Sequence, residues 1–229
     1  MIISHKYRFI FIKTAKTAGT SIEAYLSRHC GAEDILTPIY PPVMGHESRN
    51  YVGFTNPIRD IASTRGKRIK KIITTFLRRE KFFNHIPSCL IRSRVPRDVW
   101  ENYYRFCVER NPWDKTLSHY SMVSCRGKRR LSFDQYIRQG DYCLNYPLYT
   151  ERGGNSIMVN RLLHYELLST ELEDVFDMLK IPFDGTLNIQ AKREYRTDHR
   201  PYREVYTKEQ RKTIEEAFEK EIALLGYEY

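Results

Sequence analysis

Residues able to hold an anion gather near the start of the chain, in the run Lys-Thr-Ala-Lys-Thr-Ala-Gly-Thr-Ser at positions 13 to 21. Lys16 supplies a positive charge, and the small residues Ala18 and Gly19 let an anion approach the backbone. An apolar segment precedes the run and a helical pattern follows it, so the N–H groups and the dipole of a helix start would face the anion. We therefore predict a P-loop-like phosphate site made by Lys13, Lys16, Thr17, Ala18, Gly19, Thr20 and Ser21.

This run differs from the loop of ATP- and GTP-hydrolysing proteins. In their GxxxxGK[ST] pattern the lysine directly follows the second glycine. Here Lys16 precedes Gly19 by three residues. The order of residues predicts a phosphate site of another kind.

A second candidate anion site lies in the segment Glu-Arg-Asn-Pro-Trp-Asp-Lys-Thr-Leu-Ser-His-Tyr, positions 109 to 120. Arg110 follows a predicted strand over 104–109, and Pro112 suits the first position of the next helix. Ser118 then lies roughly two turns along that helix. Both side chains can reach one phosphate, with the guanidinium offering paired donors.

The two segments, about 90 residues apart, together resemble the 5′-phosphosulfate loop and the 3′-phosphate motif of sulfotransferases that use 3′-phosphoadenosine 5′-phosphosulfate (PAPS). The similarity is greatest to the carbohydrate-acting branch, and extends to Asn84-His85-Ile86-Pro87, to 159–167 and to the closing Gly-Tyr-Glu-Tyr. The chain departs from the family at 13–15, where a His-Ile-Pro-like run is usual. It also has Asn160 and His164 where the family has Asp and Arg.

The resemblance implies transfer of a sulfuryl group from PAPS to an acceptor hydroxyl, with adenosine 3′,5′-bisphosphate (PAP) as product. The similarity to the carbohydrate-acting branch implies that this hydroxyl is on a saccharide. It gives Lys16 a catalytic role at the leaving group, and it places Arg110 and Ser118 at the 3′-phosphate. A late basic segment, 192–203, resembles the loop that closes over this phosphate, and we assign Arg200 to the cofactor from it. The family needs no metal, and no cluster in the sequence has metal-ligand spacing.

The general base has two candidates. An imidazole is suited to taking a proton from a hydroxyl at neutral pH. His85 lies between the two phosphate segments, where related enzymes place their base, and it is our choice as the second catalytic residue. His46 with Glu47 is the alternative base. If His85 instead only bonds to a loop carbonyl, its role is structural.

The charge of the chain points to an anionic partner. The formal net charge is +10, and nine Lys or Arg against two acids lie between Arg59 and Lys81. This basic segment fits an acidic saccharide acceptor, while a solvated helix face is the simpler explanation. A P-loop-like kinase, a basic nucleic-acid-binding protein and a fold that binds nucleotide without turnover remain alternatives. We expect no specific nucleic acid and no membrane as partner, and the oligomeric state is open.

The pattern of apolar residues predicts an α/β fold. Strands are expected over 7–12, 104–109 and 157–165, and helices over 20–29, from Pro112, and to Gly226 at the end. Capping-box spacing at Ser132, Thr170 and Thr207 predicts three helix starts. The expected architecture is a three-layer α/β/α sandwich with a central, mainly parallel sheet, a P-loop-nucleotide-hydrolase-like sulfotransferase fold. It forms one domain, 1–229, with an irregular basic insertion at about 35–100.

The expected location is cytoplasmic. The apolar stretch at 9–12 is far shorter than a membrane helix or the apolar part of a signal peptide. The five cysteines are odd in number and have no CxxC pair, so we expect them to be reduced core residues.

Overall fold

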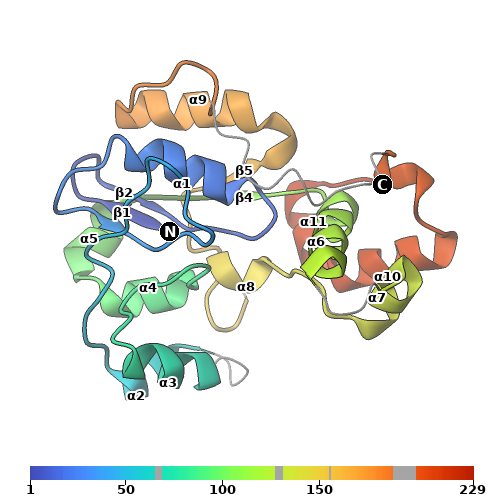
Figure 1. Ribbon diagram of the computed structural model, residues 1–229, viewed down its shortest axis with the longest axis horizontal. Helices are drawn as coiled ribbons and strands as arrows, with labels where there is room; N and C mark the ends of the chain where they lie inside the picture. Colours follow the sequence, from blue (N-terminus) through green and yellow to red (C-terminus); the bar gives the residue numbers. More distant parts are fainter. Residues whose placement is uncertain (65–68, 127–130, 155, 188–199) are drawn as a thin grey trace.

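A five-stranded sheet forms the centre of the protein (Figure 1). The computed structural model describes residues 1–64, 69–126, 131–154, 156–187 and 200–229. In spatial order the strands are β3 (Ile35–Leu36), β1 (Ile2–Ser4), β2 (Phe9–Phe11), β4 (Tyr104–Glu109) and β5 (Arg161–His164). The fold is therefore α/β, as predicted.

The sheet is mixed, which corrects the expectation of a mainly parallel one. Strand β4 lies parallel to both β2 and β5, whereas β1 runs antiparallel to β2 and to β3. The link from Ser4 to Phe9 is too short for the crossover that parallel neighbours require, so β1 and β2 pair as a hairpin. The antiparallel part lies at one side of the sheet. The parallel part carries the predicted anion segments.

Helices cover both faces of the sheet (Figure 1). On one face α1 (Gly19–Ser27) and α9 (Leu168–Leu179) pack on a core that includes Phe9, Phe106 and Phe176. The opposite core contains Ile10 and Tyr149 and draws on α4 (Ser88–Arg94), α5 (Arg97–Asn102) and α8 (Tyr146–Tyr149). The strands alternate between the two cores, as expected for strands that are buried on both sides.

A third apolar cluster lies beside the sheet, on the right in Figure 1. Trp113, Ile214 and Phe218 are buried within it, so Trp113 is a core residue. The helices around it are α6 (Pro112–Arg126), α7 (Phe133–Gln139), α10 (Lys208–Ala217) and α11 (Glu219–Leu225).

Two further helices, α2 (Pro57–Ser63) and α3 (Ile69–Leu77), lie at the lower margin of the view in Figure 1, beyond α4. They contain much of the basic segment. The buried carboxylate of Asp60 in α2 binds Arg94 of α4 with an N–O distance of 2.8 Å, which fixes α2 to the rest of the protein.

Several element boundaries test the sequence patterns. The capping boxes at Ser132 and Thr207 are present at the starts of α7 and α10. The helix start predicted at Thr170 is wrong, because α9 begins at Leu168 as the continuation of a 3₁₀ turn over Tyr165–Leu167. The last helix is divided at Phe218 and ends at Gly226, which adopts the predicted left-handed conformation.

No helix among the described residues is long and apolar enough to cross a membrane. Cys107 is a core residue, as expected, whereas Cys125 is exposed, and Cys30, Cys89 and Cys143 are half-buried.

Candidate functional site

The loop between β2 and α1 has the backbone of a tight anion cradle. Lys16 and Ala18 both have positive φ, 65° and 58°, which turns the chain sharply before the helix. A Cβ at Gly19 would come within 2.9 Å of the Lys13 side chain and 3.3 Å of the Thr14 carbonyl oxygen. Only glycine fits there. The Ser21 and Ile22 N–H groups both donate to the Ala18 carbonyl oxygen, at 2.9 and 3.1 Å, so this carbonyl closes the first turn of α1.

Two hydroxyls follow Gly19 at the helix start. Thr20 and Ser21 are 7% and 5% exposed. Both lie in the first turn of α1, where predicted, so the loop brings backbone and hydroxyl donors to one place.

Lys13, in contrast, turns into the protein. Its side chain is 5% exposed, and its Nζ lies 2.5 Å from Oε2 of the buried Glu23 in α1. The Met1 ammonium group contacts the other oxygen of the same carboxylate. Of the two loop lysines, Lys16 is the more accessible, since it is half-buried.

The loop is fastened to β4 by hydroxyls. The Thr14 hydroxyl donates to the Val108 carbonyl oxygen at 2.5 Å, and it lies 2.8 Å from the Thr17 hydroxyl. Thr17 is 1% exposed, so its side chain lies inside the protein and supports the loop through its contact with Thr14.

Asn145 holds the loop from the other side. Its Oδ1 accepts from the Ala15 N–H at 2.9 Å, and its Nδ2 donates to the Ala15 carbonyl at 3.0 Å and to Glu109 Oε1 at 3.1 Å. The side chain is buried. A single amide thus ties the loop after β2 to the end of β4.

The two predicted anion segments meet at Arg110. Its Nη1 donates to the Lys16 carbonyl oxygen at 3.1 Å, although the two residues are 94 positions apart. Its Nε and Nη2 donate to Asp114 at 2.8 and 2.5 Å, and the guanidinium lies over the Tyr165 ring, 4.2 Å from its centroid. Among the described residues, three of the five guanidinium N–H groups take part in these bonds.

Helix α6 brings Ser118 and His119 to the same region. Ser118 is half-buried. Burial lowers the pKa of His119, and the positive charge of Lys16 lowers it further, which places the lysine ammonium within electrostatic reach of this part of α6. The His119 Nδ1 is 2.8 Å from the Tyr136 hydroxyl.

A buried polar network lies beneath the loop. Glu109 and Lys115 are both fully buried and form an ion pair with an N–O distance of 2.7 Å. Glu109 also accepts from the Arg110 N–H at 3.0 Å and from the Tyr149 hydroxyl at 3.2 Å. Burial, and then the charge of Glu109, raise the pKa of the nearby Glu221 to about 7, an effect that Lys115 opposes.

His85 lies against the loop. Its Nδ1 is 3.1 Å from the Lys13 carbonyl oxygen, and its backbone has φ 56°. A carbonyl oxygen can only accept, so this contact places a proton on Nδ1 and, in the neutral ring, a lone pair on Nε2. Asn84 fixes the turn by donating to the Pro38 carbonyl at 2.5 Å.

The alternative candidate, His46 with Glu47, has different contacts. His46 Nε2 is 2.9 Å from the Thr37 carbonyl oxygen, and burial lowers the pKa of its imidazole. Glu47 is exposed. The two departures from the family pattern have structural contacts: Asn160 Oδ1 accepts from the Arg105 N–H, and His164 Nδ1 lies 2.9 Å from Glu171.

The late basic segment is described only from residue 200. Arg200 is exposed, and Arg203 lies over the Tyr202 ring. Lys192, Arg193 and Arg196 lie outside the described residues. No group of three or more potential metal ligands occurs within the described ranges.

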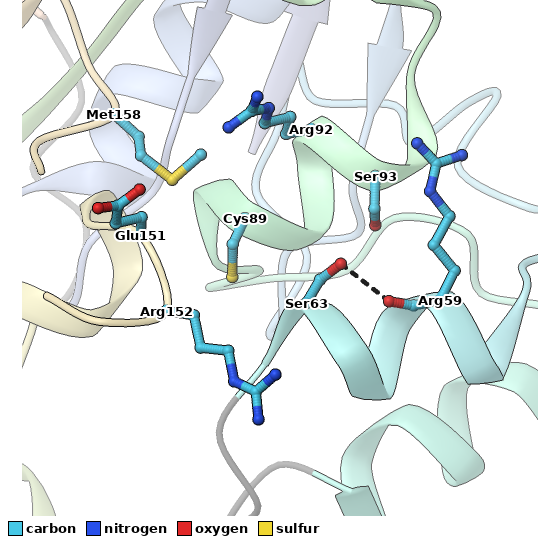
Figure 2. Close-up of a pocket in the computed structure, with 8 residues that line it drawn as sticks. All are labelled: Arg59, Ser63, Cys89, Arg92, Ser93, Glu151, Arg152 and Met158. Carbon is cyan, nitrogen blue, oxygen red and sulfur yellow. Dashed lines mark hydrogen bonds between the residues drawn. The ribbon is translucent and has the colours of Figure 1, made fainter.

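An arginine-lined hollow of about 260 Å³ lies between α2, α4 and the segment after α8. Figure 2 shows Cys89 and Ser63 toward its centre, with Arg92, Arg59 and Arg152 around it. Arg152 donates to the Ala62 carbonyl at 2.6 Å and so joins this segment to α2. An adjoining hollow of about 320 Å³ shares Arg59 and Arg92. Among the described residues that line the first hollow, Glu151 is the one acid.

Sequence reasoning did not find Asn145, Asp114 or the buried Glu109–Lys115 pair as parts of this site. Asp114 follows Arg110 by one helical turn, which is a visible ion-pair spacing. Asn145 has no such signal, because it lies 130 residues from its loop partner Ala15.

Comparison with known proteins gives one informative match. No family model matches the chain. A protein of Archaeoglobus fulgidus, named only as uncharacterized, is 32% identical over 117 residues, which cover 48% of this chain and 98% of the relative. The two chains belong to one family. Nearly the whole of the archaeal protein is matched within half of this chain, so the family's shared part is smaller than the protein described above.

Proposed function

We propose that this protein is a sulfotransferase that binds PAPS in the β2–α1 loop and transfers its sulfuryl group to an acceptor hydroxyl on a saccharide. The observation that carries the proposal is the contact between Arg110 and the Lys16 carbonyl. It unites two separate anion-binding segments at the carboxyl ends of the adjacent parallel strands β2 and β4. Ligands of α/β folds bind at such strand ends.

The donors available suit a nucleotide with two separate phosphate groups. In this proposal the loop at Lys16 to Ser21 holds the 5′-phosphosulfate, and Arg110 with Ser118 holds the 3′-phosphate. A kinase of the P-loop type would need its lysine directly after the glycine. In this chain the lysine, Lys16, comes before the glycine, and Gly19 packs closely against Lys13 and Thr14.

In the proposed reaction His85 Nε2 takes the proton of the acceptor hydroxyl while its oxygen attacks sulfur. The sulfur–oxygen bond to the 5′-phosphate breaks, and Lys16 neutralises the charge that builds on this leaving group. The backbone N–H groups of the loop stabilise the same charge. Asn145 holds the loop, and the Lys13 carbonyl orients the His85 ring.

Calorimetric titration with PAP tests the donor site. Wild-type protein should bind PAP without added metal, and ATP should bind far more weakly. Lys16→Ala and Arg110→Ala should each weaken PAP binding by roughly tenfold or more, since each removes a charged hydrogen-bond partner. Arg97→Ala is the matched control, because Arg97 is exposed and pairs with Glu101 in the same helix.

Absence of PAP binding, or equal binding of ATP in the presence of Mg²⁺, would exclude this function and favour a kinase. Binding of PAP by a protein that catalyses no transfer to any acceptor would favour the alternative of a fold that binds nucleotide without turnover.

For the acceptor, the arginine-lined hollow supports an acidic saccharide. Cys89 in its wall follows His85 by four residues, so their Cα atoms are at most about 14 Å apart. Three arginines, Arg59, Arg92 and Arg152, line the hollow together with Glu151, which favours an anionic group there. An acceptor held by Arg59 and Arg92 could therefore extend to the proposed base.

Substitution of Arg92 tests this acceptor. Arg92→Gln should raise the KM for a carboxylated or sulfated saccharide several-fold, leave the KM for a neutral one unchanged, and leave PAP affinity unchanged. Equal effects on neutral and acidic acceptors would exclude the role of this hollow in acceptor selection.

A further inference from the structure

Exposed apolar side chains are concentrated on α2, α3 and the segment that leads into them. Of the fifteen large apolar side chains that are exposed among the described residues, eight lie between Val52 and Leu77. Ile58 is 80% exposed, Leu77 75% and Phe54 72%. We call this surface the α2–α3 face; its apolar members are Val52, Phe54, Ile58, Ile61, Ile69, Ile73, Phe76 and Leu77. Exposed apolar side chains that are concentrated in one part of a protein point to an interaction site.

The helices that carry the α2–α3 face are held in place by other contacts. Helix α3 packs inward through Ile72 and Thr75, while Ile69, Ile73 and Phe76 follow each other at helical spacing on another side. The segment before α2 is joined to the end of α3, because the Gly53 N–H donates to the Arg79 carbonyl at 2.7 Å. The exposed apolar residues are thus held in place by other contacts of the same helices.

Cations surround these apolar side chains. The Arg79 guanidinium lies over the Phe54 ring at 5.0 Å. Among the described residues from 52 to 79 the one acid is Asp60, and its carboxylate is buried against Arg94. The exposed charges of this part of the surface are therefore all positive: Arg59, Lys70, Lys71, Arg78 and Arg79.

The position of the face makes it accessible to a flat surface. In Figure 1, α2 and α3 lie at the margin of the protein, with α4 between them and the sheet. Apolar side chains flanked by Lys and Arg on amphipathic helices are characteristic of segments that lie in the interface of an anionic membrane.

We propose that the α2–α3 face docks on the surface of an anionic phospholipid membrane, with its apolar side chains among the headgroups and its cations against the lipid phosphates. A second copy of the chain fits less well, because a symmetric contact would bring the same cations together. This proposal revises the expectation that no membrane is a partner. That expectation came from the lack of a spanning segment, which peripheral docking does not require.

Co-sedimentation with vesicles tests the proposal on the whole protein. Binding should occur to phosphatidylcholine vesicles that contain phosphatidylserine, weaken as salt is raised, and be lost with phosphatidylcholine alone. Leu77→Ser should weaken it roughly tenfold, since one exposed leucine no longer enters the membrane. Lys70→Glu with Arg78→Glu should weaken it at least about tenfold.

Matched controls lie elsewhere on the surface. Met178→Ser replaces an apolar residue of α9 that is 50% exposed, and Lys208→Glu with Lys212→Glu reverses two charges on α10. These variants should bind vesicles as the wild type does, and thermal unfolding of every variant checks that it is folded.

Three results would overturn the proposal: no binding to the anionic vesicles, equal binding to both vesicle types, or equal losses in the control variants. If the protein self-associated without lipid, and Leu77→Ser abolished this association, the face would instead be assigned to contact with a second copy of the chain. PAP titration of the same variants is independent of this outcome, because none of the substituted residues belongs to the proposed donor site.

Discussion

At the scale of single residues, the proposed chemistry depends on His85 and on the proton position that its backbone contact sets. The Lys13 carbonyl accepts from Nδ1, which directs Nε2 to act as the base. The residue also has a left-handed backbone conformation, which few side chains adopt readily.

His85→Asn is the sharpest test of this role. Asparagine tolerates positive φ and offers an amide donor for the Lys13 carbonyl, so the turn should survive while the base is lost. We expect turnover to fall by about 10²–10⁴-fold, with PAP affinity unchanged. Steady-state kinetics and PAP titration measure the two quantities. If His46→Asn gave this loss and His85→Asn did not, the base would be the alternative histidine.

The residue scale also shows what sequence could predict of the site. Lys16, Gly19 and Arg110 were found because each lies at a fixed offset from a strand end, and the structure brings their segments together. Lys13 was assigned to the cofactor by position alone. Its buried contact with Glu23 depends on how α1 packs, which no local spacing encodes.

At the scale of elements, patterns succeeded where an element is long or sharply bounded. The strand over 104–109 agrees with β4 because a run rich in aromatic and apolar residues ends before Asn111-Pro112. The three-residue β1 was missed, since so short a run shows no periodicity. The division of the last helix at Phe218 was missed too, because apolar spacing continues across it.

Asn145 connects three elements and provides a prediction at this scale. Asn145→Ala removes its bonds to Ala15 and Glu109, and so frees the loop after β2 from the end of β4. PAP affinity should fall roughly tenfold, and the free energy of unfolding should fall by about 1–3 kcal/mol. Calorimetry and urea unfolding measure these effects.

Tyr149→Phe is the control for Asn145. It removes a different bond to Glu109, at 3.2 Å, without touching the loop. It should cost stability while leaving PAP affinity at the wild-type value. If both variants lost stability and neither lost PAP affinity, Asn145 would be a structural residue and no more.

At the scale of the whole molecule, the site lies where the sheet meets the cluster of α6, α7, α10 and α11. Glu109 at the end of β4, Lys115 in α6 and Glu221 in α11 place three ionisable groups in the interior there. Buried charges of this kind link the protonation state to the stability of the whole fold.

Glu221→Gln tests this linkage. Burial and the charge of Glu109 raise the pKa of Glu221 to about 7, whereas an unfolded glutamate titrates near 4.5. Between these values the folded protein binds more protons than the unfolded chain, so this group makes stability fall as pH rises from about 4.5 to 7. Glutamine keeps an acceptor for the Tyr146 N–H and stays neutral. The free energy of unfolding of the variant should therefore match that of the wild type near pH 4.5 and exceed it above pH 7, by about 3 kcal/mol at most.

Urea unfolding across this pH range measures the difference. Glu219→Gln, on the exposed side of the same helix, should show no such difference. A wild-type stability that fell in parallel with that of Glu221→Gln would mean that a group other than Glu221 carries the proton.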